Sequence, residues 1–281
     1  MTITYVTITY NAADVLKRTL DSVLRQDYRD IVHLIIDGAS TDGTLQIVED
    51  YIQRSNAADN GHRIQVTSEP DHGIYDAMNK GLRSLDGDYV CFLNAGDFLP
   101  ASDTVSRIVS QGDGSFVTSA DVTKEPSPCD TKEPSPCDTP AVLYGDTDIV
   151  DSEGRFLHHR RLAPPEHLTW KSFRYGMLVC HQAFYARTDF AIATPYDLRY
   201  RYSADVDWCI RIMKAAAKEN IPLHNLHMVV ANYTEEGQTT LHHRESLIER
   251  FRVMTRHYGW LSTIAMHVWF VFRSLLSRKA D

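Results

Sequence analysis

The first hundred residues alternate between short apolar runs and segments whose apolar residues recur every three to four positions. Residues 3–10 are rich in β-branched and aromatic side chains, which is typical of a strand, and leucines and valines at helical spacing follow over residues 16–24. The pair of patterns recurs, with strands expected at 31–36, 64–67 and 89–93 and helices at 45–52 and 74–82. Such alternation predicts an α/β fold with a mostly parallel central sheet flanked by helices.

Polar residues follow each of these four expected strands, at 9–11, 37–42, 68–73 and 94–97. Any one of these segments, taken alone, reads as an Asx or glycine turn. The carboxyl ends of parallel strands share one edge of a sheet, and α/β proteins bind ligands at that edge. Four polar segments at corresponding positions therefore predict a binding site there.

The middle of the chain contains two exact copies of the octapeptide TKEPSPCD, at residues 123–138. Four prolines among charged residues do not form a packed element, and two copies are too few for a solenoid. We expect a flexible surface insertion over residues 121–140. The duplication itself explains the spacing of Cys129 and Cys137, so neither a metal pair nor a disulfide is expected. Further strands are expected at 142–150 and 180–186, and a helix that begins with Ser203 as its cap.

The composition excludes several classes of protein. The 281 residues are 43% hydrophobic and 23% charged, which is ordinary for a globular chain, and the net charge of −8 does not suit a nucleic-acid coat protein. The five cysteines include no C-x-x-C pair, so a reducing compartment is favoured. No secretory signal is evident in the first ten residues, and no apolar stretch reaches the length of a spanning helix. These features predict a cytoplasmic protein.

Six motifs in this order resemble the family 2 glycosyltransferases of GT-A fold, and most of all the bacterial branch that builds capsular and other extracellular polysaccharides. They are TYN at 9–11, IDGASTDGT at 36–44, SEPDHGIYDAMNKGL at 68–82, FLNAGD at 92–97, CHQAFY at 180–185 and SADVDW at 203–208. The match covers about residues 1–215. The resemblance implies transfer of a sugar, with inversion, from a nucleotide-diphosphate donor to an acceptor hydroxyl, and a lipid-linked glycan as acceptor.

The resemblance also implies a cradle for the nucleotide, where a carboxylate accepts a hydrogen bond from the base. It assigns nucleotide contacts to Thr9, Tyr10, Asn11 and Asp37, and contacts near the nucleotide and donor sugar to Asp71, Asp76 and Asn79. Lys80 would offset phosphate charge in this interpretation. Asp76 and Lys80 suit an i,i+4 ion pair on an exposed helix face equally well.

The family's Asp-x-Asp signature corresponds here to Asn94-Ala95-Gly96, with Asp97 next. Both usual carboxylates are absent, so we expect Asp97 to contact Mg²⁺ or Mn²⁺ and Asn94 to add a carbonyl oxygen. This departure from the family pattern favours a weakly held ion that arrives with the donor.

The candidate general base is Asp205, which matches the second residue of the family's Glu-Asp motif, with Ala204 in place of the glutamate. Asp207 competes for this role, but helix residues two apart face different ways, so one of them at most points at the acceptor. Both acids also suit the dipole of a helix N-terminus. His181 and Gln182 match a His-Gln pair of this branch. Two roles remain open for the histidine: one near the acceptor or the diphosphate, and one that is structural.

The last residues differ in charge from the rest of the chain. Residues 250–281 carry a net charge of +5, which leaves −13 for the first 249. Residues 260–276 form an expected helix with a wide apolar face, two tryptophans and basic neighbours. We therefore predict a glycosyltransferase domain over 1–240 and a helical segment over 241–281 that lies on an anionic membrane surface, at the inner face of the cytoplasmic membrane. The alternative is packing on the catalytic domain or on a second subunit.

Two other functions remain open from the sequence. A non-catalytic protein that binds nucleotide-sugars or glycans would explain the missing Asp-x-Asp carboxylates. A sugar nucleotidyltransferase shares the expected sheet, but residues 9–14 contain none of the glycine, lysine and arginine that its phosphate loop needs.

Overall fold

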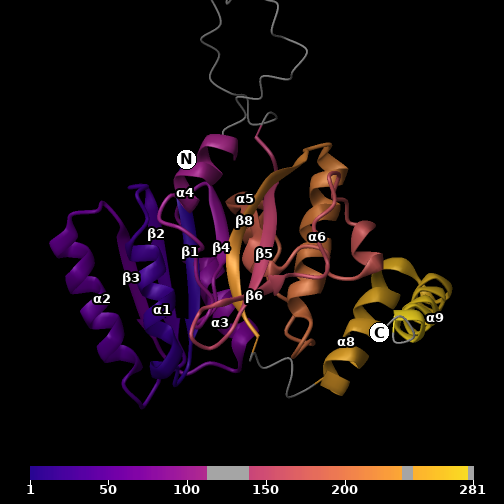
Figure 1. The fold of residues 1–281 in the computed structure, drawn as a ribbon, viewed down its shortest axis with the longest axis horizontal. Coiled ribbons are helices and arrows are strands. Elements are labelled where there is room, and N and C mark those ends of the chain that lie inside the picture. The colour runs from indigo at the N-terminus through magenta and orange to yellow at the C-terminus, as the bar shows by residue number, and fades with distance from the viewer. Residues whose placement is uncertain (113–138, 236–242, 278–281) are drawn as a thin grey trace, which may run out of the picture.

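The computed structural model describes residues 1–112, 139–235 and 243–277 (Figure 1). One eight-stranded sheet with helices packed against it confirms the predicted α/β class. The N-terminal elements are β1 (Ile3–Thr9), α1 (Ala13–Leu24), β2 (Ile31–Asp37), α2 (Thr44–Ala58), β3 (Arg63–Ser68), α3 (Ile74–Arg83), β4 (Tyr89–Phe92) and α4 (Thr104–Gly112). The repeats at 123–138 lie outside the described residues.

The second half completes the sheet and adds the C-terminal helices. Its elements are β5 (Val142–Val150), β6 (Phe156–His159), η1 (Ser172–Tyr175), η2 (His181–Ala183), β7 (Phe184–Arg187), α5 (Thr188–Ala193), α6 (Ala204–Glu219), β8 (Leu223–Thr234), α8 (His243–Tyr258) and α9 (Trp260–Ser277). The strand order is β3-β2-β1-β4-β7-β5-β6, with β8 beside β5. β1 to β4 are mutually parallel and β8 is parallel to β5, whereas β7 and β6 are antiparallel to their neighbours.

One predicted strand is shorter than expected. Residues 180–186 were expected to form a single strand, but His181–Ala183 is a 3₁₀ turn and β7 begins at Phe184. The N–H of Ala183 donates to the carbonyl of Cys180, 2.9 Å away, instead of joining a neighbouring strand. The turn directs His181 and Gln182 toward the end of β4, as described below.

Helices cover both faces of the parallel strands, which explains why β1, β2 and β4 are buried throughout. Successive side chains of β2 point to opposite faces. Ile35 packs with Leu16 and Tyr51 of α1 and α2, whereas Leu34 and Ile36 belong to the larger core on the other face. The sheet is thereby fixed from both sides, and its carboxyl edge is held in place.

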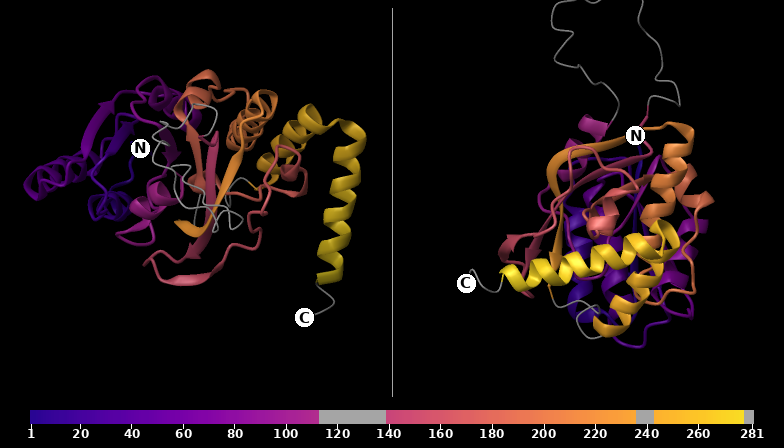
Figure 2. Two further views of the ribbon diagram at one scale, coloured as in Figure 1. Left: turned by 90° about the horizontal axis from the view of Figure 1, so that it is seen from above. Right: turned by 90° about the vertical axis from the view of Figure 1, so that its right-hand side faces the viewer.

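The C-terminal helices form the side of the molecule away from β3 (Figures 1 and 2). α8 packs against α6, and α9 packs against α8 and η1. Gly259 separates α8 from α9 in a left-handed backbone conformation (φ +80°), which glycine adopts readily. Within the described residues, no helix has the length and apolar character that crossing a membrane requires.

Candidate active site

The carboxyl ends of β1, β2 and β3 lie side by side, with Thr9 opposite Asp37 and Asp37 opposite Ser68. Asp37 is fully buried, and its carboxylate accepts hydrogen bonds from the Ser40 N–H (2.9 Å), the Ser40 hydroxyl (2.5 Å) and the Ser68 hydroxyl (2.6 Å). These bonds fix the loop after β2 against the end of β3. Asp37 thus organises the edge where the nucleotide was predicted.

The loop after β1 leaves several groups open to a ligand. The Thr9 hydroxyl is buried without a partner in the described part of the chain, and Tyr10 is 66% exposed. Asn11 adopts a left-handed conformation (φ +46°), and its side-chain Oδ1 accepts from the Thr41 N–H, 2.9 Å away. The loop is therefore held by Asn11 while Tyr10 presents an exposed ring.

Asp71 reaches the same place from the loop after β3. A Cβ atom placed on Gly38 would lie 2.6 Å from Asp71 Oδ2 and 3.2 Å from Tyr10 Cδ2. The absence of a side chain at Gly38 thus allows Asp71 and Tyr10 to approach each other. The other Asp71 oxygen accepts from the Gly73 N–H at 2.8 Å. Tyr10, Asp37 and Asp71 are brought together as predicted, at the ends of three different strands.

The predicted residues on α3 have other partners. Asp76 accepts from the His72 N–H (3.0 Å), and both ends of the Asn79 amide bond to the backbone of Tyr196. Lys80 contacts Glu69 Oε1 (2.9 Å) and the carbonyl of Pro70 (2.7 Å), so the alternative Asp76–Lys80 ion pair is wrong. Ligand contacts by Asp76 and Asn79 stay predictions.

A chain of polar side chains connects the end of β4 to the first turn of α6. The Asn94 amide nitrogen donates to His181 Nε2 (3.0 Å), and His181 Nδ1 lies 3.4 Å from Asp205 Oδ2. The Tyr75 hydroxyl donates to Asp205 Oδ1 at 3.1 Å. Asn94 Oδ1 is buried and has no partner among the residues described. Asp205 is therefore held from two sides, and Asn94, on the other side of His181, keeps one amide oxygen without a partner.

The pKa of Asp205 lies below its ordinary value. Burial acts to raise the pKa, but the hydrogen bond and charge of His181 and the charge of Arg250 outweigh burial and lower it. The carboxylate is consequently ionised at neutral pH, which is the state in which it can accept a proton.

Asp207 points away from this cluster, in agreement with the expectation that the two acids face different ways. It is fully buried and bonds to Arg211 Nε (2.6 Å) on its own helix and to His257 Nε2 (2.7 Å) on α8. Asp207 therefore fastens α8 to α6, whereas Asp205 faces the carboxyl edge of the sheet. The Ser203 hydroxyl, which was expected to cap α6, makes no capping bond and donates to the carbonyl of Ser246 (3.3 Å).

Asp97 is 5% exposed and joins three segments. Its Oδ2 accepts from Gln182 Nε2 (2.7 Å) and its Oδ1 from the Thr234 N–H (3.1 Å). Burial raises the pKa of Asp97 to about 6, against the lowering effect of these bonds. No group of three or more His, Cys, Asp or Glu side chains suited to a metal occurs in residues 1–112, 139–235 and 243–277. A carboxylate has about four acceptor positions, so two remain on Asp97.

The sequence did not single out Tyr75, the bond between Gln182 and Asp97, or the contribution of Arg250 to the lowered pKa of Asp205. Tyr75 and Gln182 lie within the motifs quoted above, and that location was the sequence signal that could have identified them. Arg250 stands 45 residues after Asp205 in sequence, in a segment interpreted from its charge, its apolar face and its tryptophans. No local pattern connects it to the site.

The sequence model of "Glycosyl transferase family 2" matches residues 4–125. The "PGL/p-HBAD biosynthesis glycosyltransferase" of Mycobacterium tuberculosis is 34% identical over 230 residues, which are 82% of this chain and 75% of that protein. The same match is found for the Mycobacterium bovis protein of that name.

Solved structures share the fold at low sequence identity. TarS 1–349 of S. aureus in complex with UDP superposes with a TM-score of 0.61 at 16% identity, over 92% of this chain, and this chain spans 65% of that one. The mannosyltransferase PcManGT from Pyrobaculum calidifontis in complex with GDP-Man and Mn²⁺ gives a TM-score of 0.56 at 16% identity, over 99% of this chain and 79% of that one. Glucosyl-3-phosphoglycerate synthase from Mycobacterium tuberculosis, in complex with Mn²⁺, UDP and its product, gives 0.53 at 16% identity, over 91% and 80%.

Proposed function

The chain belongs to glycosyltransferase family 2 and has the GT-A fold, and from this premise we propose that it transfers a sugar, with inversion at the anomeric carbon, from a nucleotide-diphosphate donor to an acceptor hydroxyl. The observation that carries the proposal is Asp205, an ionised carboxylate held between Tyr75 and His181 at the carboxyl edge of the sheet. Its place beside the predicted donor site suits a general base.

In the proposed reaction Asp205 accepts the proton of the acceptor hydroxyl while that oxygen attacks the anomeric carbon. The bond from this carbon to the diphosphate oxygen breaks, and its electron pair leaves with the diphosphate. Attack from the side opposite the leaving group inverts the configuration. Tyr75 and His181 keep the carboxylate in position, and orientation of this kind is a large part of catalysis.

For the donor, we propose a cradle made by Thr9, Tyr10, Asn11, Asp37 and Asp71, with Asp76 and Asn79 on the adjoining helix. The exposed Tyr10 ring, the unpartnered Thr9 hydroxyl and the proximity of Asp71 support this assignment. TarS was solved with UDP and PcManGT with GDP-Man, so a nucleoside diphosphate in this fold has precedent.

A divalent cation, Mg²⁺ or Mn²⁺, fits the end of β4 when most of its ligands come from the donor and water. Asn94 Oδ1 and a free acceptor position of Asp97 are the protein oxygens available there, and hard ions prefer oxygen ligands. Bound there, the ion would supply positive charge to the leaving diphosphate. Two of the similar structures contain Mn²⁺.

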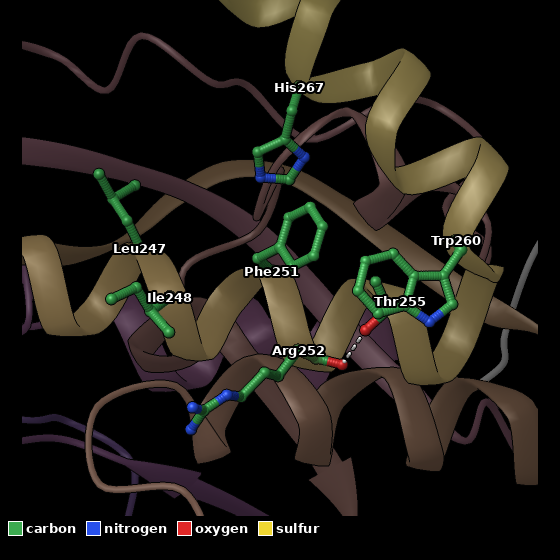
Figure 3. Close-up of a pocket in the computed structure, with 7 residues that line it drawn as sticks. All are labelled: Leu247, Ile248, Phe251, Arg252, Thr255, Trp260 and His267. Carbon is green, nitrogen blue, oxygen red and sulfur yellow. Dashed lines mark hydrogen bonds between the residues drawn. The ribbon is translucent and has the colours of Figure 1, made fainter.

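The acceptor in this proposal is a lipid-linked glycan at the inner face of the cytoplasmic membrane, and residues 241–281 attach the enzyme to that surface. A group of exposed apolar side chains supports it, which we call the tail patch: Leu247, Ile248, Trp260, Leu261, Ile264, Val268 and Trp269. A groove of about 520 Å³ between α8 and α9 adjoins it, with Phe251 beside Trp260 and His267 (Figure 3).

The structure changes which charges are available to the membrane. Arg256 is bound to Asp197 (2.8 Å) and lies 3.6 Å from Asp207, and the charge of Arg250 contributes to lowering the pKa of Asp205. Arg252 is exposed and lines the groove. The proposed attachment therefore rests mainly on apolar side chains, which insert at the boundary of head groups and acyl chains.

Replacing Asp205 by asparagine tests the proposed function. The amide keeps the shape but does not take the proton, so product formation from UDP- or GDP-sugars should stop while donor affinity stays within about twofold. Asp59→Asn is the matched control, because Asp59 is exposed at the end of α2 and its backbone (φ +47°) suits asparagine. Turnover by the Asp205 variant would contradict the proposal.

Sedimentation with vesicles tests the tail patch. Leu261→Ser combined with Val268→Ser should move the protein from phosphatidylglycerol vesicles to the supernatant, because both side chains are more than half exposed and apolar. Leu45→Ser and Val15→Ser, on α2 and α1, are matched exposed controls. Equal binding of all variants would contradict membrane attachment through α9.

The missing Asp-x-Asp carboxylates favour one competing function, a non-catalytic protein that binds nucleotide-sugars or glycans. Donor hydrolysis measured with Mn²⁺ and with EDTA separates the two, because hydrolysis that depends on the ion requires a working site.

A further inference from the structure

The 3₁₀ turn η2 supplies one side chain to each half of the candidate site. Its first residue, His181, lies 3.4 Å from the carboxylate of Asp205, and the next residue, Gln182, bonds to Asp97. Gln182 is fully buried, and its backbone carbonyl accepts from the thiol of Cys91 on β4, 3.2 Å away. The turn is therefore fastened to the strand that leads into the candidate cation site.

The amide of Gln182 is bonded at both ends, which fixes its orientation. Its Nε2 donates to Asp97 Oδ2 at 2.7 Å, and its Oε1 accepts from the Cys180 thiol, also at 2.7 Å. A carboxylate accepts hydrogen bonds and a thiol donates one, so the amide nitrogen faces Asp97 and the amide oxygen faces Cys180. Cys180 thereby keeps the donor end of the amide directed at Asp97.

Asp97 is held at both of its oxygens as a result. The Thr234 N–H, at the end of β8, donates to Oδ1 at 3.1 Å, while Gln182 holds Oδ2. The Thr234 hydroxyl also donates to the carbonyl of Gly96, the residue before Asp97, at 2.8 Å. One bond on each oxygen keeps the carboxylate from rotating, so its two remaining acceptor positions have fixed directions.

The predicted base has supports other than this amide. Glu249 on α8 accepts from the three backbone N–H groups of residues 201–203, at 2.9, 2.7 and 3.1 Å, just before the first turn of α6. Tyr75 holds Asp205 itself at 3.1 Å. A change in the amide of Gln182 should therefore act on the cation site and leave the base in place.

We propose that Gln182 is a positioning residue for the divalent cation: it holds the carboxylate of Asp97 in the orientation that receives the ion together with the nucleoside diphosphate. This inference rests on the proposed function. Groups that hydrogen-bond to a metal-binding carboxylate orient it, and replacing them typically weakens metal affinity by about 10- to 100-fold. Orientation matters more in this chain because the segment 94–97 contains one carboxylate and no second one to share the ion.

Titration calorimetry of the full chain with UDP and GDP, at a series of Mn²⁺ concentrations and in EDTA, tests this assignment. Gln182→Met removes the amide and keeps the length of the side chain. The Mn²⁺ concentration that gives half of the gain in affinity for the better-bound nucleotide should rise by about 10- to 100-fold, while affinity in EDTA stays unchanged because no ion is then involved. Cys180→Ala should produce a smaller rise, and Cys180→Ser, which keeps a donor, should recover most of it.

Gln26→Met is the matched control. Gln26 is also a buried glutamine, and its amide bonds to the carbonyls of Ser22 (2.9 Å) and Ala101 (2.7 Å) and to the N–H of Val105 (3.1 Å), all outside the candidate site. Loss of this amide should lower Tm and leave the Mn²⁺ dependence of nucleotide binding unchanged. The control thus separates a general loss of stability from an effect on the ion.

An unchanged Mn²⁺ dependence in Gln182→Met would overturn the proposal. A loss of nucleotide affinity of the same size in EDTA and in Mn²⁺ would also overturn it, because Gln182 would then support the fold of the donor site and not the ion. A wild-type chain whose nucleotide affinity does not respond to Mn²⁺ would remove the cation and this inference with it. A wild-type chain that binds neither UDP nor GDP would instead remove the proposed function as a whole.

Discussion

Asp205 and Asp207 stand two residues apart on α6, and replacing each by asparagine should produce opposite defects. Asp207 is fully buried and contacts two arginines and a histidine: Arg211 (2.6 Å), Arg256 (3.6 Å) and His257 (2.7 Å). Breaking a buried ion pair by removing one partner costs about 3 to 5 kcal/mol, and asparagine keeps one acceptor oxygen. We therefore expect Asp207→Asn to lose about 3 kcal/mol of unfolding free energy, or roughly 6 to 12 °C in Tm.

Thermal unfolding followed by circular dichroism measures the effect, and it has a pH signature. The bonds to His257 and Arg211 outweigh burial and lower the pKa of Asp207. A lowered folded pKa contributes stability that is present above the unfolded pKa, about 3.9, and is lost as the pH falls through the folded value. The difference between wild type and variant should therefore be full at pH 7 and shrink below pH 4.

The result that would refute this reasoning is specific. If Asp207→Asn leaves Tm within about 2 °C of the wild type but abolishes transfer, Asp207 is the base and the assignment of the two acids is reversed. Asp205→Asn is the matched comparison, because the same chemical change there should abolish transfer with a much smaller loss of Tm.

Three further outcomes follow from the site. Tyr75→Phe removes the hydrogen bond to Asp205 and should lower kcat about tenfold with donor affinity unchanged; an unchanged kcat would mean that His181 alone positions the carboxylate. Gly38→Ala places a Cβ 2.6 Å from Asp71 Oδ2 and should weaken UDP or GDP binding in calorimetry with little change in Tm; normal affinity would take Asp71 out of the cradle. EDTA should abolish transfer and Mn²⁺ should restore it, while Tm stays constant because the described residues contain no cluster of metal ligands; full activity in EDTA would exclude the cation.

The sequence predicted the sheet well because its signals are local. Residues 31–36 and 89–93 are mostly apolar, residues 142–150 begin and end with apolar side chains, and the structure has strands in all three places within one residue. The 180–186 segment has the same composition, but its first residues form a 3₁₀ turn that holds Gln182 against Asp97. Apolar periodicity does not show which polar side chain will bond to which, as Gln182 does to Asp97.

The sequence predicted where the site residues lie in the fold, but it did not predict which groups they contact. The motifs placed Tyr10, Asp37 and Asp71 at one edge, where the structure has them, but Asn79 is engaged with the Tyr196 backbone. The charge of the tail suggested a membrane partner for Arg256, which is bound to Asp197 of the catalytic body instead. Such contacts join residues 59 and 117 positions apart, which no local pattern reveals.

The contact between Glu249 and residues 201–203 joins two segments that are synthesised at different times. The strands and motifs of the sheet leave the ribosome first, and the segment at 201–203 leaves well before the helix whose carboxylate holds it. A nascent chain that has folded its nucleotide edge still lacks the carboxylate that holds residues 201–203, just before Asp205. A nonsense mutation between residues 235 and 249 would therefore keep all the strands of the sheet and lose the carboxylate that holds residues 201–203.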